Sequence, residues 1–139
     1  GIIIALFEMV MISKIENKRS PVFYIITGAL LVGIAYLLLL IPTKFPIAIA
    51  LILTVIITLG EMLSLPFINT FVISRSNEFN RGQYAAGYTL SWSAAQVIGP
   101  TAGFYLAGHF GYNVLWIILA LLLLICALIY SRLDMSEEK

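Results

Sequence analysis

The residues with the most potential for chemistry lie in one apolar stretch, LTVIITLGEMLSLPFINT, in which Glu61 is the single carboxylate. On a helix, which advances about 100° per residue, four polar residues fall within roughly 120° of one another: Thr54, Thr58, Glu61 and Ser64. Asn69 lies just beyond this sector, and it is predicted to line a substrate cavity together with the two threonines and the serine. A carboxylate at membrane depth costs several kcal/mol unless it faces protein or water. The stripe therefore predicts a pathway or pocket in which Glu61 binds a proton or a substrate; a purely structural ion pair is the alternative.

A second stretch, from Tyr84 to Ala107, is rich in glycine and carries aromatic side chains. At helical spacing, five of its residues fall within about 80° of one face: Tyr88, Trp92, Gln96, Gly99 and Gly103. Aromatic rings beside an amide suit an amphipathic organic ligand, so the first three are predicted to line a substrate cavity. The alternative is that they only fill space. Gly99 and Gly103 belong to a row of small residues that permits close contact between membrane helices.

Other reactive residues are interpreted more simply. Cys126 stands in an all-apolar run and is interpreted as a small apolar filler. His109 is interpreted as a loop residue, and Glu8 as an interfacial one. No spacing typical of a metal site, a cofactor-binding loop or a catalytic triad occurs, so neither an enzyme nor a metal or cofactor is predicted.

The composition places the chain in the membrane class, with 61% hydrophobic and 11% charged residues. Soluble domains carry about 25% charged residues and lack apolar runs of about 20. The net charge of +1 gives no indication of a nucleic-acid partner. The predicted surroundings are therefore a lipid bilayer.

The apolar segments predict an all-α, polytopic transmembrane helix bundle that occupies residues 1–139 as a single membrane domain. We expect one partial span and four full ones, at residues 1–12, 22–41, 47–73, 84–107 and 114–130. Pro21 should open a helix, and Pro66 should kink the one that carries Glu61. The uniformly aliphatic spans 22–41 and 114–130 are expected to face lipid. Because the chain begins inside an apolar run, we expect it to be a piece of a longer protein.

Basic residues predict the orientation. Seven of them lie on one side of the implied zigzag: Lys14, Lys18, Arg19, Arg75, Arg81, Arg132 and Lys139. Lys44 alone lies on the other. Positive charge concentrates in cytoplasmic loops, so the first side, with the carboxy terminus, is predicted to be cytoplasmic.

These features together resemble the carboxy-terminal half of a Major Facilitator Superfamily transporter, from the end of the eighth helix to the twelfth. The residues that carry the resemblance are Gly60-Glu61-Met62 with Pro66, Arg81-Gly82, and Gly99-Pro100 with Gly103. They are similar to the tenth and eleventh helices of the drug/proton antiporter branch. In the first loop, Glu16, Lys18 and Arg19 fill the acid and basic positions of the family's motif, whereas Ile12 replaces its glycine.

The resemblance implies twelve helices in two halves that alternate access to a central cavity. It implies an amino-terminal half, a small organic substrate and protons as partners, and a bacterial plasma (inner) membrane as the location. The predicted function is proton-coupled export of small organic molecules or drugs. A sugar or metabolite facilitator of the same superfamily is one alternative. A small tetraspan interaction protein without transport activity is another.

Overall fold

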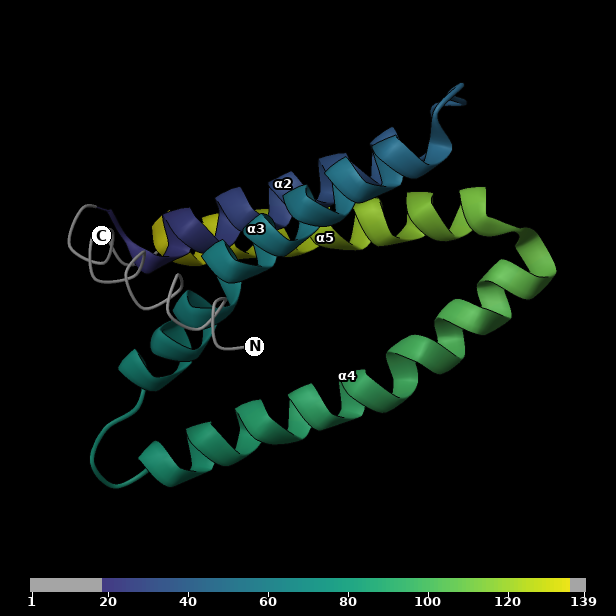
Figure 1. Cartoon of the computed structure of the whole chain (residues 1–139). Coiled ribbons are helices and arrows are strands. Elements are labelled where there is room, and N and C mark those ends of the chain that lie inside the picture. Colours follow the sequence, from purple (N-terminus) through teal and green to yellow (C-terminus); the bar gives the residue numbers. More distant parts are fainter. Residues whose placement is uncertain (1–18, 136–139) are drawn as a thin grey trace.

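The computed structural model describes residues 19–135, and side chains as far as Leu133. Four helices make up its regular structure (Figure 1): α2 (Pro21–Leu38), α3 (Pro46–Ser74), α4 (Arg81–Phe110) and α5 (Tyr112–Met135). The prediction of an all-α bundle is confirmed. The partial span at 1–12 and the loop residues Glu16 and Lys18 lie outside the described residues.

The ends of the helices follow from local chemistry. Proline has no N–H to lose in the first turn, and both α2 and α3 begin with one, Pro21 and Pro46. The hydroxyl oxygen of Ser20 accepts a hydrogen bond from the N–H of Phe23 at 3.4 Å, which caps α2. Between α4 and α5 stands one residue, Gly111, whose φ of 84° favours glycine.

Helix α2 packs along both α3 and α5, and Figure 1 shows the three on one side of the molecule. The tightest contact joins α2 to α3. A Cβ built on Gly28 would lie 2.5 Å from the carbonyl oxygen of Gly60 and 2.8 Å from the Cβ of Ser64. A Cβ on Gly60 would lie 2.6 Å from Cγ2 of Val32. The missing side chains therefore let two backbones touch, as small residues do between membrane helices.

Nearer the start of α2, aromatic rings fill the contact between α2 and α3. Tyr24 stacks on Phe67 with ring centroids 4.6 Å apart, and both are buried together with Ile25. Phe71 meets Tyr130 of α5 edge-on at 5.4 Å. This cluster ties α2, α3 and α5 together beyond the point where the glycines meet.

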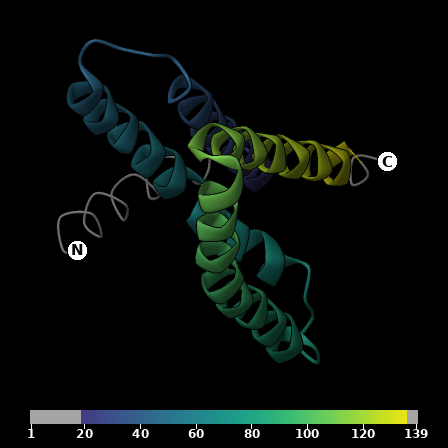
Figure 2. The ribbon, with the colours of Figure 1, turned by 90° about the vertical axis from the view of Figure 1, so that its right-hand side faces the viewer.

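Helix α4 stands apart from the other three. It lies across from them as the open arm of a V and meets them only toward its ends (Figures 1 and 2). None of its residues is buried. The aliphatic span 22–41 was expected to face lipid. The structure differs, because α2, which contains most of that span, is the most enclosed helix among the described residues.

Three of the described helices are long and apolar enough to cross a membrane: Pro21–Leu38, Pro46–Ser74 and Tyr112–Leu133. Helix α4 has 30 residues but a more polar sequence, and it is not among them. That α4 also crosses stays a prediction. The carboxy-terminal part of α3, which contains Pro66, turns away from α2 in Figure 1. Since proline lacks the N–H that would bond the carbonyl of Met62, a bend is expected there.

Candidate functional site

Glu61 lies near the middle of α3 and its side chain is exposed. Its neighbours in sequence, Gly60 and Met62, are both buried. The carboxylate is thus exposed on a turn of α3 whose neighbouring residues are buried. An exposed carboxylate on an apolar candidate span must meet protein, water or lipid, and lipid is the costly choice.

The hydroxyl groups of the predicted stripe do not all share the surroundings of Glu61. Thr54 and Thr58 donate to the carbonyl oxygens one turn earlier, at 2.8 and 2.9 Å. Thr54 is exposed and Thr58 half-buried. Ser64 is buried against α2 and donates to the carbonyl of Gly60 at 3.0 Å. The structure therefore leaves Glu61 and Thr54 open and places Ser64 inside the helix contact.

An open groove of about 870 Å³ separates α4 from α3 and α5. Tyr88 and Trp92, two of the predicted cavity residues, line it. Gln96 and Glu61 do not. The remaining lining comes from all three helices: Ile68, Val72, Gln83, Tyr84, Gly87, Ser91, Ala95, Cys126 and Tyr130. The structure brings the aromatic residues of α4 together but does not join them to Glu61.

The groove contains residues that sequence reasoning missed. Tyr130 stands opposite the α4 aromatics on a helix that was interpreted as lipid-facing. Cys126, interpreted as a filler, is exposed there. The signal was weak, since Tyr130 is one aromatic residue at the end of an aliphatic run, and its partner Phe71 is remote in sequence.

A second aromatic group joins α2 to α5. Tyr36 of α2 stacks on Trp116 of α5, with centroids 5.6 Å apart and planes 9° from parallel. Tyr112 stacks on the same Trp116 at 6.1 Å. The sequence analysis named none of these three aromatic residues.

Asn69 and Arg81 were predicted for different sites, a substrate cavity and a cytoplasmic loop. The structure places both at one hollow, together with Thr70, Ile73 and Ser74. The connection between α3 and α4 is short, and it brings the start of α4 back beside the last turns of α3. Arg19, also predicted for the loop region, lies with its guanidinium carbon 4.9 Å from the ring centroid of Phe23.

Gly99 and Gly103 stand in open space: a Cβ built on either would meet no heavy atom of the described residues within 4 Å. Their role in helix packing stays a prediction that concerns a partner outside this part of the chain. The glycines that do pack closely are Gly28 and Gly60, which the sequence analysis did not single out for packing. Gly60 was noted only as part of a motif.

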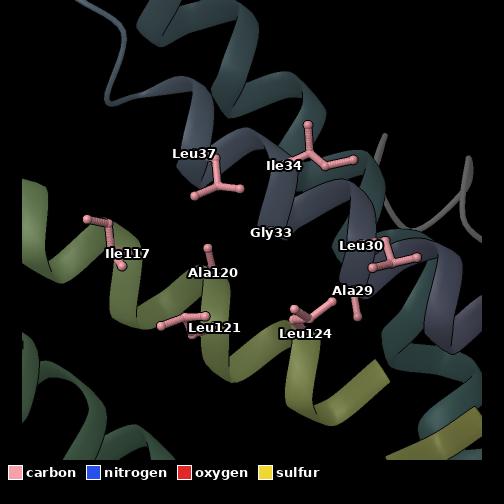
Figure 3. A pocket seen from close by; sticks show the side chains of 9 residues that line it. All are labelled: Ala29, Leu30, Gly33, Ile34, Leu37, Ile117, Ala120, Leu121 and Leu124. Carbon is pink, nitrogen blue, oxygen red and sulfur yellow. The ribbon is translucent and has the colours of Figure 1, made fainter. Parts of the chain in front are cut away.

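The contact between α2 and α5 leaves a smaller, apolar groove of about 160 Å³ (Figure 3). Small residues form its floor and aliphatic side chains its walls: Ala29, Leu30, Gly33, Ile34, Leu37, Ile117, Ala120, Leu121 and Leu124. It offers no polar group to orient a substrate. Within residues 19–135, no cluster of His, Cys, Asp and Glu side chains is suited to hold a metal ion.

Three of the described helices have the length and apolar composition of membrane spans, and this indicates a polytopic integral membrane protein. The sequence profile of the Major Facilitator Superfamily matches residues 1–139, and the chain belongs to this superfamily of membrane transporters. It is similar to the "Uncharacterized MFS-type transporter YhjO" of Bacillus subtilis (strain 168), with 33% identity over 78 residues. The match covers 56% of this chain and 20% of that protein. No solved structure matches the chain significantly.

Proposed function

We propose that the chain provides the carboxy-terminal helices of a proton-coupled exporter of small organic molecules, with Glu61 as the proton- or substrate-binding group. One observation carries the proposal: an exposed carboxylate in the middle of an apolar helix 29 residues long. Lipid cannot solvate that charge cheaply, so it faces the cavity of the whole transporter. Proton coupling requires a group that can take up and release a proton inside the transporter, and a carboxylate can do both.

The substrate side of the proposal rests on α4. Tyr88 and Trp92 line the groove between α4 and the other helices, and 45% of Trp92 is exposed. Rings of this kind bind amphipathic and aromatic molecules, and Gln96 on the same helix adds an amide for orientation. The family membership supports transport, and these residues favour small organic substrates over sugars, which need many hydrogen-bonding groups.

The location follows the same reasoning. We place the protein in the plasma (inner) membrane of a bacterium, with the connection between α3 and α4 and the carboxy terminus in the cytoplasm. The basic residues Arg75, Arg81 and Arg132 support this orientation.

The test is Glu61→Gln in the full-length transporter. The amide keeps the shape and hydrogen bonding of the carboxylate but cannot titrate. In vesicles with an imposed pH gradient, we expect accumulation of fluorescent amphipathic dyes to fall at least about tenfold, while passive exchange persists. Glu78→Gln is the matched control, because Glu78 lies in the exposed connection between α3 and α4.

The outcomes separate the alternatives. Undiminished gradient-driven accumulation in Glu61→Gln, with normal affinity for the dye, would make Glu61 a structural residue. Dye transport that is insensitive to the pH gradient in wild type as well would favour a facilitator. A full-length protein that moves neither dyes nor sugars under any gradient would favour an interaction protein.

A further inference from the structure

A hollow between α3 and α4 gathers polar side chains that the proposed transport mechanism does not use. We call it the Arg81 hollow; it has a volume of about 400 Å³ and is lined by Asn69, Thr70, Ile73, Ser74 and Arg81. The first four belong to the last turns of the candidate membrane span Pro46–Ser74, and Arg81 begins the next helix. We therefore expect the hollow to lie at the boundary of the membrane, at the level of lipid headgroups.

The lining favours an anion. None of the five residues is acidic, and Arg81 supplies a positive charge with donors arranged as a fork. This geometry matches the oxygens of a phosphate group in a way that lysine cannot. Asn69 is exposed and contributes two further N–H donors from its amide. A cation and an amide that line one open space are the groups that an oxyanion needs.

Side chains, rather than the backbone, would make the contacts. The N–H groups of Arg81 and Tyr84 already donate to the carbonyls of Asn77 and Asn80, at 3.0 and 3.1 Å. The hydroxyls of Thr70 and Ser74 donate to carbonyls of their own helix, at 3.1 and 2.8 Å. They can turn toward a ligand only by giving up those bonds. The guanidinium and the Asn69 amide remain as the principal donors.

We propose that the Arg81 hollow binds a phosphate group, held by the Arg81 guanidinium and the Asn69 amide. The group is either the headgroup of an anionic phospholipid or a free phosphate. The site is independent of Glu61, so its failure and the failure of proton coupling are distinguishable.

A carboxylate in the adjoining hollow provides an internal competitor. Glu78 and Arg81 line an adjoining hollow with Ser76 and Asn77. A negative charge there competes for the same guanidinium and repels a phosphate. Removal of the Glu78 charge should therefore strengthen binding of phosphate at Arg81. An unspecific attraction to the basic face of the membrane would not depend on this particular position.

The test uses the full-length transporter, purified in detergent and stripped of lipid. In one arm, native mass spectrometry measures binding of phosphatidylglycerol against diacylglycerol with the same acyl chains. In the other, thermal unfolding is followed with increasing inorganic phosphate at constant ionic strength. Arg81→Gln and Asn69→Leu should each weaken binding roughly tenfold, the size expected for loss of a hydrogen bond to a charged group. Glu78→Gln should tighten it.

Arg132→Gln is the matched control, since Arg132 is a basic residue of α5 that does not line the hollow. Binding in the lipid arm alone assigns the site to a headgroup, and binding in the phosphate arm alone assigns it to a solute. Absence of saturable binding in both arms overturns the proposal. So does an equal loss in Arg132→Gln. If Arg81→Gln does not fold, Asn69→Leu, which keeps every charge, decides the result.

Discussion

Helices α3 and α4 both carry glycine where a close neighbour can approach, yet the two helices have opposite surroundings. On α3, Gly60 is buried against α2, and even one added carbon would meet the side chain of Val32. On α4, Gly99 and Gly103 meet nothing within 4 Å among the described residues. Glycine on α3 thus makes a close helix contact, whereas glycine on α4 has no neighbour among the described residues. Which glycine packs depends on what lies opposite, and the sequence does not state that.

The largest effect is expected at the α2–α3 contact. Gly28→Ala and Gly60→Ala should destabilise the full-length protein by about 1–3 kcal/mol, because the added carbon forces two backbones apart. Helix propensity alone would favour alanine by about 1 kcal/mol, so the sign of the change is informative. Thermal unfolding in detergent provides the measurement.

Gly33→Ala is the control for these variants. Gly33 lies on α2, as Gly28 does, and its added carbon would be 3.7 Å from the nearest atom, which is an ordinary contact. Stabilisation by all three substitutions would show that the backbones of α2 and α3 are not in contact.

A smaller effect is expected on the open side. Gly99→Leu and Gly103→Leu should lower the yield of monodisperse full-length protein, because we expect this face to pack against a helix outside the described residues. Gly82→Leu, on the same helix and equally open here, serves as the comparison. If all three substitutions are tolerated equally, Gly99 and Gly103 have no role in helix packing, and only the glycines at the α2–α3 contact do.

A helix with so little packed surface depends more on its ends. Asn77 and Asn80 bond each other's backbone: Oδ1 of Asn77 accepts from the N–H of Asn80 at 3.0 Å, and Oδ1 of Asn80 accepts from the N–H of Asn77 at 2.8 Å. Asn77→Ala should cost about 1 kcal/mol and speed hydrogen exchange in the first turn of α4. Glu78→Ala, which leaves both bonds in place, should change neither. Equal exchange rates in the two variants would show that packing, rather than this pair, holds the start of α4.

The smallest effect on stability is expected for two cysteine substitutions, one beyond each end of α3. They show which end of α3 faces the cytoplasm. Phe79 is 97% exposed and Lys44 is exposed at the other end of α3. In a background without Cys126, Phe79→Cys should resist an impermeant thiol reagent added to intact cells, whereas Lys44→Cys should react. The opposite pattern would invert the orientation.

Hydropathy and proline positions were enough to predict an all-α fold for the described residues. The predicted segment 47–73 overlaps α3 (Pro46–Ser74), because its apolar run has a proline at its start and polar residues after its end. Helix formation is local in the chain, so local sequence reports it. The all-α class followed from the same observations.

Pairing between helices could not be predicted in the same way. The contact of Gly28 with Gly60 depends on the register of two helices, which no pattern within either one specifies. The meeting of Asn69 with Arg81 depends on the path of a short connection. The sequence also assigned Ser64 to the stripe of Glu61, because an angular sector about 120° wide spans both the exposed and the buried side of a helix.

The single residue between α4 and α5 has a mechanical consequence. Gly111 is the one described residue with positive φ, and no loop separates its two helices to absorb a change in angle. Helix α4 has 30 residues, about 45 Å at 1.5 Å per residue, so a rotation of about 10° at Gly111 would carry its far end about 8 Å. That far end is tied to α3 by the few residues around Asn77. A change in the backbone angles at Gly111 would therefore move the start of α4, and with it the end of α3 that is connected to it.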